Sequence, residues 1–365
     1  MKIAVLIPTL YKHQGADRVF WQMANHLAIQ GHEVSIFAFK GNMEPPPNVR
    51  LTTIGMPTGF FGERLFHLTL PLNVFKNIKY ARMLKEFDII YTDIYPASWL
   101  AYLAKQLYDK KYIFFCHHLT PPGFMPGFIA QTYKRIHVFF EICTLKQADS
   151  IICVSEFSKN SLRNIYRKKI EVIYNTVDCS RFNPGLDRVK IRDKYGLGNQ
   201  PVILFVGQLS PHKNVHVLID AFHRIKAVIP QAYLIIVGKA AYPGYEKTLH
   251  RIADDAVIFA GEVSDEELPY YYAACDVYAT ASLLEGFNIP LVEAQACGKP
   301  VVAFDTGPHP EVVDDGKTGI LVPLCDTSSL SSAIIKLLQD KELINMMGNQ
   351  GTVMVRKRFC LNQAQ

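Results

Sequence analysis

The sequence predicts an α/β protein of two domains, each built on a parallel β-sheet. The chain has 365 residues, more than a single hydrophobic core usually serves. Short apolar runs rich in β-branched residues alternate with helical patterns along most of its length, which is typical of doubly wound sheets. The alternation breaks near residues 178–200. We therefore expect two Rossmann-like domains that face each other across a cleft.

The expected strands are continuous apolar runs, which suit strands buried on both faces of a parallel sheet. In the first half they are Lys2–Thr9, Glu33–Phe39, Val49–Ile54, Asp88–Asp93, Tyr112–His117, Ser150–Ser155 and Ile170–Asn175. In the second half they are Val202–Gly207, Ala232–Gly238, Val257–Glu262, Val277–Ser282, Pro300–Asp305 and Gly319–Pro323.

Helical patterns separate most of these strands and place the domain boundary. They include Ala16–Gln30, Ala97–Tyr108, Val215–Val228, Asp265–Ala274, Pro290–Ala296 and Ser328–Gln339. Turn-forming residues at 183–185 and 196–199 bracket a charged stretch. We therefore expect domains at residues 1–183 and 200–365, joined by a linker at 184–199.

Composition excludes several classes of protein. Hydrophobic residues make up 49% and charged residues 20%, which is ordinary for a folded domain and excludes long disorder. The formal charge of +6 suits anionic partners such as phosphates or an acidic lipid surface. Eight scattered cysteines without a CxxC pair favour free thiols over a disulfide framework or a zinc site. The short apolar run that ends at Pro8 resembles neither a signal peptide nor a spanning helix, so we expect a cytoplasmic protein.

The segment 282–294 carries the most chemical information. A strand is expected to end at Ser282, a loop with Gly286 follows, and Pro290 suits the first turn of a helix. The amides at such a helix start can hold a diphosphate or sugar oxygen. They belong to Phe287, Asn288 and Ile289. Glu285 and Glu293 can each accept hydrogen bonds from sugar hydroxyls; the alternative is two surface glutamates favoured near a helix N-terminus.

This segment resembles a known family. The run Glu-Gly-Phe-x-x-Pro-Leu-x-Glu-Ala at 285–294 resembles the signature motif of glycosyltransferase family 4 (group 1), a retaining family of GT-B fold. Five other segments resemble family motifs in the family's order: 15–19, 154–159, 172–178, 206–214 and 298–303. The resemblance runs from about residue 1 to residue 355. Three departures are Gln208 where arginine is frequent, Asn288 in place of glycine, and Gln14-Gly15 in place of a glycine pair.

The resemblance implies that the second domain binds a nucleotide-sugar donor. Lys213 follows that domain's first strand, where its ammonium would neutralise the diphosphate leaving group; the alternative is a solvated surface lysine. The family holds the nucleotide base near Val263. The full set expected to bind the donor is Gly207, Gln208, Lys213, Gly238, Val263, Ser282, Glu285, Gly286, Phe287, Asn288, Ile289 and Glu293.

The resemblance also implies that the first domain binds the acceptor. A histidine after the strand Tyr112–His117 is expected to contact the transferred sugar. His117 ends the apolar run and is preferred to His118, since side chains alternate at a strand end. A paired-histidine metal site is the competing idea, but no third ligand is nearby. Gly15, Ala16 and Arg18 begin the first helix and would meet the acceptor or the donor phosphates; Arg18 is otherwise a solvated first-turn residue.

The predicted activity is retaining, metal-independent transfer of a hexose to a glycan or lipid-linked acceptor in cell-envelope glycan biosynthesis. His117, His118, Lys213 and Glu285 are the expected catalytic residues. Mannose is favoured, with glucose and N-acetylglucosamine as alternatives, from a GDP- or UDP-sugar, and we expect no cofactor and no nucleic-acid partner. Other candidates are an epimerase or phosphorylase of the same fold, a non-catalytic nucleotide-sugar-binding protein, and an NAD-binding protein. The chain has no GxGxxG fingerprint after Lys2–Thr9, which disfavours the NAD-binding protein.

Two segments of the first domain combine aromatic and basic residues. One is 60–66 followed by Lys76 and Lys79, and the other is 124–146. Amphipathic helices of this composition can lie at a membrane interface with their cations toward anionic headgroups. The alternative is that Phe139 and Phe140 are core residues. The chain ends near 356–359, where the family usually adds a further helix, and the apolar surface this leaves would strengthen attachment. We therefore expect peripheral attachment to an anionic membrane surface, where a lipid-linked acceptor is found.

Overall fold

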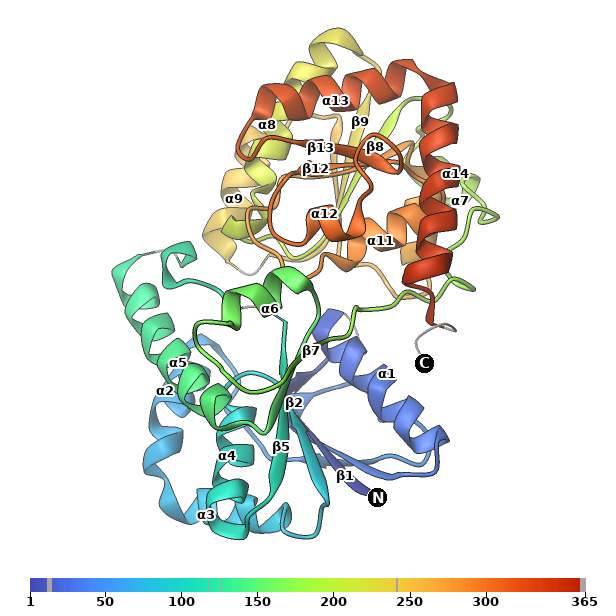
Figure 1. Ribbon diagram of the computed structural model, residues 1–365. Coiled ribbons are helices and arrows are strands. Elements are labelled where there is room, and N and C mark those ends of the chain that lie inside the picture. The colour runs from blue at the N-terminus through green and yellow to red at the C-terminus, as the bar shows by residue number, and fades with distance from the viewer. Residues whose placement is uncertain (12–14, 118, 126, 241, 362–365) are drawn as a thin grey trace. The chain divides into compact units, whose positions relative to one another are not determined.

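The computed structural model describes residues 1–11, 15–117, 119–125, 127–240 and 242–361. The chain divides into two compact units, Met1–Ile173 and Tyr174–Gln365. We call them the N-terminal and C-terminal units. Each is an α/β layer structure with its own sheet and its own hydrophobic core (Figure 1).

The described residues of the N-terminal unit form a seven-stranded parallel sheet of order β3-β2-β1-β4-β5-β6-β7. Its strands are β1 (Lys2–Leu10), β2 (Glu33–Gly41), β3 (Arg50–Thr53), β4 (Ile89–Thr92), β5 (Lys111–Cys116), β6 (Ser150–Cys153) and β7 (Ile170–Val172). Its helices are α1 (Gly15–Ile29), α2 (Phe60–Thr69), η1 (Leu70–Leu72), α3 (Val74–Met83), α4 (Ala97–Tyr108), η2 (Pro122–Phe124), α5 (Phe128–Gln147) and α6 (Glu156–Leu162). Figure 1 shows α1 on one face of the sheet and α2 to α5 on the other.

The described part of the C-terminal unit contains a six-stranded parallel sheet of order β10-β9-β8-β11-β12-β13. Its strands are β8 (Val202–Val206), β9 (Tyr233–Val237), β10 (Val257–Gly261), β11 (Val277–Thr280), β12 (Val301–Phe304) and β13 (Gly319–Val322). Its helices are α7 (Val189–Lys194), η3 (Pro211–Lys213), α8 (Val215–Val228), α9 (Pro243–Ile252), α10 (Leu268–Ala274), α11 (Ile289–Ala296), α12 (His309–Val312), α13 (Thr327–Gln339) and α14 (Lys341–Arg358).

The predicted fold class is confirmed, because every strand expected from the sequence is present with its ends shifted slightly. Strand interiors are buried on both faces, as the continuous apolar runs indicated; Ile203, Leu204 and Phe205 of β8 are examples. Since all strands in each sheet are parallel, their carboxyl ends lie along one edge, where ligands of such sheets bind.

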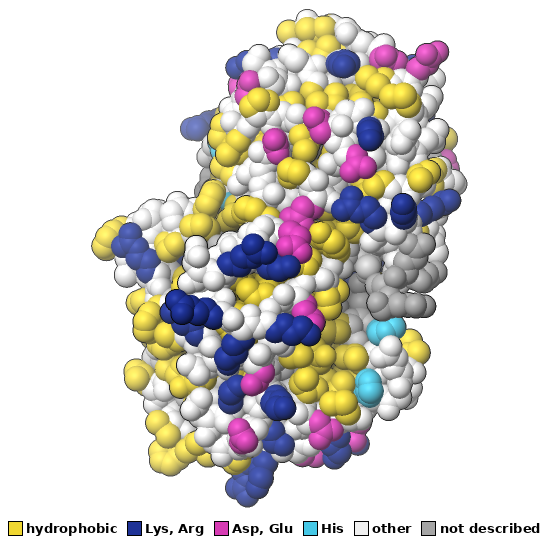
Figure 2. Space-filling view, in the orientation of Figure 1, with side chains coloured by type: hydrophobic (Ala, Val, Ile, Leu, Met, Phe, Trp, Pro, Cys, Tyr) yellow, Lys and Arg dark blue, Asp and Glu magenta, His cyan; other side chains and the backbone are white. Residues whose placement is uncertain are grey.

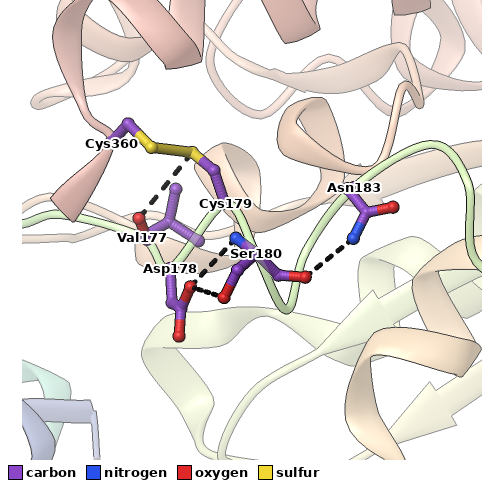
Figure 3. Close-up of a disulfide and its surroundings, with 6 residues drawn as sticks. All are labelled: Val177, Asp178, Cys179, Ser180, Asn183 and Cys360. Carbon is purple, nitrogen blue, oxygen red and sulfur yellow. Dashed lines mark hydrogen bonds between the residues drawn. A yellow bond between two sulfur atoms is a disulfide. The ribbon is translucent and has the colours of Figure 1, made fainter. Parts of the chain in front are cut away.

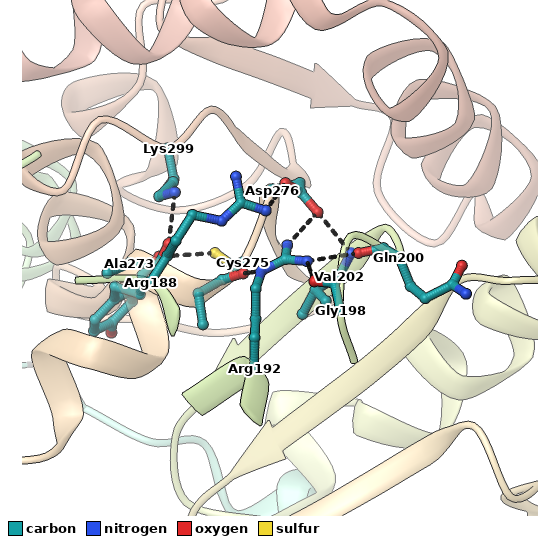
Figure 4. A network of polar contacts seen from close by, with 11 residues as sticks. Arg188, Arg192, Gly198, Gln200, Val202, Ala273, Cys275, Asp276 and Lys299 are labelled. Atoms are coloured by element: carbon teal, nitrogen blue, oxygen red, sulfur yellow. Dashed lines mark hydrogen bonds and ion pairs between the residues drawn. The ribbon is translucent and has the colours of Figure 1, made fainter. Parts of the chain in front are cut away.

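The segment expected to form a linker, residues 184–199, is fastened within the C-terminal unit. Arg192 of α7 is buried and donates four hydrogen bonds (Figure 4). One reaches the Asp276 carboxylate at 2.8 Å, and the others reach carbonyls of Ala274, Gly198 and Gln200. Asp276 also accepts from the backbone of Val202 at the start of β8. A buried guanidinium with this many partners holds α7 against the sheet.

The expectation that all eight cysteines are free is wrong for one pair. Cys179 and Cys360 form a disulfide with Cα atoms 5.8 Å apart (Figure 3). The segments carrying them pair through backbone: Val177 N donates to Phe359 O, and Leu361 N donates to Val177 O. The two cysteines are 181 residues apart, so local sequence gave no sign of the contact. The other six cysteines are free.

Among the described residues, we find no helix long and apolar enough to cross a membrane.

Candidate active site

The centre of the C-terminal unit's site is an ion pair between Lys213 and Glu285. Lys213 ends η3, which follows β8, and Glu285 lies in the loop after β11. The two loops are tied together, because Leu283 N donates to His212 O at 2.8 Å. Lys213 Nζ donates to Glu285 Oε1 at 2.6 Å, with side chains 17% and 9% exposed. The sequence therefore placed both residues at one sheet edge, and the structure brings them into contact.

Glu285 is held in its ionised form. Burial alone would raise the pKa of its carboxyl, but the charge of Lys213, the hydrogen bond from Lys213, and the nearby His309 and Ser282 together lower it. Such a carboxylate can accept hydrogen bonds from ligand hydroxyls without first losing a proton. Lys213 gives the same position a positive charge in partly desolvated surroundings.

His309 supports this loop and was missed by the sequence analysis. It is fully buried at the start of α12, after β12. Its Nδ1 lies 2.7 Å from Phe304 O and its Nε2 lies 2.9 Å from Asn288 Nδ2. Because a carbonyl only accepts, Nδ1 carries the proton and Nε2 accepts from the Asn288 amide. Burial lowers the pKa of His309, which favours this neutral form.

Asn288 is the residue that turns the loop into α11. Its φ of 68° and ψ of 64° are left-handed, a conformation that asparagine tolerates better than most non-glycine residues. The hydrogen bond to His309 fixes its side chain. Asparagine at this position, where the family has glycine, thus gives its side-chain amide a buried hydrogen-bond partner in His309.

Glu293 is held by a different partner. It is buried in α11 and its Oε2 accepts from the Tyr272 hydroxyl at 2.7 Å. Its expected role toward the nucleotide ribose stays a prediction.

The remaining expected donor-binding residues lie at the ends of β8 to β11. Gly238 follows β9, where a Cβ atom would lie 1.9 Å from Gly207 O, so only glycine fits there. Gln208 is exposed after β8, and Val263 is half-buried after β10. In the loop before α11, Ser282, Gly286 and Phe287 are buried, and Ile289, the first residue of α11, is half-buried.

In the N-terminal unit, His117 follows β5 as expected. It is half-buried, its ring packs near Phe20 and Phe115, and its carbonyl accepts from Ser158 Oγ at 3.1 Å. His118 lies outside the described residues, so His117 alone can be placed.

The start of α1 is exposed at Gly15 and half-buried at Ala16 and Arg18. Asp17, by contrast, is buried and caps the strand that precedes it: its carboxylate accepts from Tyr11 N at 2.7 Å and Thr9 Oγ1 at 3.1 Å. Burial raises the pKa of Asp17 to about 7, against the effect of these hydrogen bonds.

A second buried group of titratable side chains in the N-terminal unit was also missed. Asp93 follows β4, and burial raises its pKa to about 8, with nearby Glu141 adding to the rise. Glu141 and His137 of α5 are buried 3.5 Å apart. His67 of α2 contacts the His137 ring, and burial lowers the pKa of His67 to about 3. The available signal was Asp93 itself, which ends an expected strand.

The described residues hold no group of three or more His, Cys, Asp or Glu side chains placed to bind a metal ion.

Two parallel-sheet units, one carrying a lysine–glutamate pair at its strand ends, define a protein of the GT-B class. Solved structures agree with this. The chain superposes on a sucrose-phosphate synthase from Thermosynechococcus elongatus with a TM-score of 0.84 and 23% identity, covering 100% of this chain and 96% of that one. Anabaena HepE in complex with UDP and glucose gives a TM-score of 0.83 and 24% identity, covering 100% and 97%.

Sequence comparison identifies the family. The model for glycosyl transferases group 1 matches residues 187–354, and that for glycosyltransferase family 4 matches residues 13–181. A D-inositol 3-phosphate glycosyltransferase of Stackebrandtia nassauensis is 30% identical over 345 residues, 87% of this chain and 77% of that protein. The chain therefore belongs to glycosyltransferase family 4, the group 1 glycosyltransferases.

A further relative is the GDP-mannose-dependent alpha-(1-6)-phosphatidylinositol monomannoside mannosyltransferase of Mycolicibacterium smegmatis. It is 36% identical over 219 residues, 56% of this chain. The match spans about half, 56%, of that relative's length.

Proposed function

We propose that the chain is a retaining, metal-independent hexosyltransferase that uses a nucleotide-sugar donor. The observation that carries this proposal is the 2.6 Å contact between Lys213 and Glu285 at the strand ends of the C-terminal unit. In this contact a cation that could neutralise a diphosphate lies beside an ionised carboxylate that could accept from sugar hydroxyls. The family membership of the chain supports the same reading.

The chemistry follows from these two groups. The bond between the sugar's anomeric carbon and the diphosphate breaks, and the diphosphate leaves with the electron pair. Lys213 stabilises that developing negative charge, and preorganised charge of this kind is the largest catalytic contribution in many enzymes. The acceptor oxygen bonds to the same face of the anomeric carbon, and its proton passes to the departing phosphate oxygen. The configuration is then retained. Because Lys213 supplies positive charge at the leaving group, the proposed mechanism requires no metal.

Glu285 and the loop behind it position the donor sugar. The carboxylate accepts from sugar hydroxyls, while Asn288 and His309 keep the loop in one conformation before the donor arrives. A loop that is already ordered costs less conformational entropy on binding.

We propose mannose from GDP-mannose as the donor and a lipid-linked glycan as the acceptor. The support is the name of the relative at 36% identity, a GDP-mannose-dependent mannosyltransferase acting on a phosphatidylinositol mannoside. Glucose from UDP-glucose is the second candidate, since HepE was solved with UDP-glucose. The cytoplasmic location stays a prediction from the sequence.

The test measures nucleoside diphosphate release from GDP-mannose, UDP-glucose and UDP-N-acetylglucosamine, with and without a phosphatidylinositol mannoside acceptor. We expect release from GDP-mannose to be fastest, NMR of the product to show the α-anomer, and EDTA to leave the rate unchanged. Inhibition by EDTA that added Mg²⁺ reverses would overturn metal independence. Lack of turnover with all three donors, in a protein that binds GDP or UDP, would favour a non-catalytic binding protein.

A further inference from the structure

A cluster of aromatic side chains packs against the loop of residues 282–288, here called the donor loop. The rings of Tyr174, Phe287 and Phe359 have their centroids 5.5 to 5.9 Å apart. Phe287 belongs to the donor loop and is 3% exposed, and Phe359, which follows α14, is fully buried. Edge-to-face contacts between rings add to the stabilisation that burial gives. The aromatic cluster, as we call these three rings, therefore fixes the donor loop close to Glu285.

A disulfide joins the two segments that carry the other members of the aromatic cluster. Cys360 follows Phe359 directly, and Cys179 lies on the segment that begins with Tyr174. Their Cα atoms are 5.8 Å apart, a separation that disulfides span (Figure 3). Beside the disulfide, Val177 N donates to Phe359 O at 2.8 Å. We call the disulfide and this backbone hydrogen bond the clasp, and together they fix the backbone from which the Phe359 ring projects.

The end of α14 is tied to the donor loop by a second route. Arg358 donates to Glu311 O of α12 at 2.7 Å, and its guanidinium lies 4.8 Å from the centre of the Phe359 ring. Helix α12 begins at His309, which accepts from the Asn288 amide of the donor loop. The residues at the end of α14 therefore reach the donor loop both through the aromatic cluster and through α12.

The disulfide is accessible to a thiol reagent, because both of its cysteines are half-buried and not enclosed in the core. The residues before Cys360 include the exposed cations Arg356, Lys357 and Arg358. Figure 2 shows Lys and Arg side chains gathered on the C-terminal unit near the end of α14. Neighbouring cations stabilise a thiolate, whether it attacks the disulfide or leaves it. The surroundings of the clasp therefore favour its opening by a dithiol.

We propose that Phe359 is a positioning residue for the donor loop and that the clasp makes its effect depend on the redox state of the protein. The proposal rests on the donor site proposed above. With the disulfide closed, the Phe359 ring holds Phe287, so that Glu285 and Asn288 are in place before the donor binds. With the disulfide open, the residues after α14 gain conformational freedom. Ordering them again when the donor binds lowers its affinity.

The opening step is thiol–disulfide exchange with a dithiol, for which dithiothreitol is the probe. One thiolate of the dithiol attacks a cysteine sulfur, the S–S bond breaks, and the other cysteine leaves as a thiolate. The second thiol of the reagent then displaces the first cysteine from the mixed disulfide. The dithiol is oxidised to a disulfide, and Cys179 and Cys360 together gain two electrons and two protons.

The first test measures KM and kcat for the donor that the panel of nucleotide sugars identifies, with and without dithiothreitol. Reduction should raise KM by about three- to tenfold, the scale of ordering one more side chain on binding, and leave kcat unchanged. Cys179→Ser/Cys360→Ser should show the raised KM without dithiothreitol and no response to it. The matched control is the exposed, free pair Cys143→Ser/Cys325→Ser, which should respond to dithiothreitol as the parent does.

The second test removes the ring. Phe359→Leu should raise KM to a similar extent, and reduction should then add nothing further, because the disulfide acts through this ring. Phe359→Met serves the same purpose if the leucine variant does not fold. The matched control is Phe222→Leu, at a fully buried residue of α8. It should lower the melting temperature but leave KM, and the response of KM to dithiothreitol, as in the parent.

Hydrogen exchange reports on the donor loop without any turnover. Reduction should speed amide exchange in residues 282–296, the donor loop and α11, by about threefold or more, and leave β8 unchanged. Faster exchange in a protein that turns over no donor contradicts the proposed function and supports the clasp. Turnover with KM and exchange unchanged on reduction overturns the clasp, even if the melting temperature falls, because the disulfide is then structural only. Free thiols at Cys179 and Cys360 in protein purified without reductant also overturn it.

Discussion

Carboxylates that follow strands in the two units have opposite electrostatic surroundings. In the C-terminal unit Glu285 contacts the Lys213 ammonium, and the pKa of its carboxyl is lowered in spite of burial. In the N-terminal unit burial raises the pKa of Asp93 to about 8 and that of Asp17 to about 7. Asp93 Oδ1 has no hydrogen-bond partner among the described residues.

A site with a fixed ion pair is preorganised for a charged diphosphate. In the N-terminal unit burial instead favours the protonated, uncharged form of Asp93 and the neutral form of His67, whose pKa is lowered to about 3. Variants in both units test this contrast.

Replacing Lys213 by alanine should lower turnover by about 100-fold or more while the protein remains folded. The variant loses the cation proposed for the leaving group, and it also leaves the Glu285 carboxylate buried without its partner, which costs stability. Turnover and melting temperature are both measured, with the exposed Lys317→Ala as the control. The double variant Lys213→Met/Glu285→Gln should recover melting temperature but not turnover. Near-normal turnover in Lys213→Ala would remove Lys213 from the mechanism.

Glu285→Gln should lower kcat/KM for the nucleotide sugar by about tenfold or more, the scale of losing one hydrogen bond to a charged group. Binding of the nucleoside diphosphate alone, measured by calorimetry, should be retained because Lys213 is still present. The pH dependence has a definite sign. A lowered pKa stabilises the fold above the ordinary value of 4.5, and the stabilisation is lost as pH falls through the lower folded value. The melting temperatures of parent and variant should therefore converge only in acid. If the affinity for the nucleoside diphosphate falls as much as kcat/KM does, Glu285 has a structural role.

The sheets could be predicted because a parallel strand that is buried on both faces appears in the sequence as a continuous apolar run. Several long-range contacts could not be predicted. Lys213 and Glu285 were placed together because each follows a strand of one sheet. His309 obeys the same rule after β12, but it lies beyond the expected strand end at Asp305 and was not singled out. Arg192 and Asp276 are 84 residues apart, and nothing local marks them as partners. Helices α2 and α3 were anticipated only as an amphipathic segment of aromatic and basic residues, without bounds.

Asp93→Asn should stabilise the N-terminal unit, with a shift of melting temperature that depends on pH. The folded protein holds the Asp93 proton up to about pH 8, whereas the unfolded chain releases it near 3.8. Stability therefore falls as pH rises between these values, and asparagine, which carries no proton to lose, avoids the loss. We expect no difference at pH 3, a growing gain toward pH 8 and a plateau above it. The gain should reach several degrees, since about 1 kcal/mol shifts the midpoint of a domain this size by roughly 2–4 °C. The exposed Asp109→Asn is the control, and a gain that did not vary with pH would show that the pKa of Asp93 is the same in the folded and the unfolded chain.

The smallest effect is expected at Asn288, where the contribution of the backbone conformation can be separated from that of the side-chain hydrogen bond. Glycine adopts the left-handed conformation of this residue without strain, so Asn288→Gly removes only the hydrogen bond to His309. Asn288→Ala removes the same bond and adds the steric cost of a Cβ at positive φ, about 1 kcal/mol or more. We therefore expect KM for the nucleotide sugar to rise by about fivefold or less in Asn288→Gly and clearly further in Asn288→Ala. His309→Ala, which leaves the Asn288 backbone unchanged, should match the glycine variant in KM. If KM rises equally in all three variants, the side-chain hydrogen bond alone orders the loop and the backbone conformation of Asn288 adds nothing. If KM rises only in His309→Ala, the imidazole acts on Glu285 and not through Asn288.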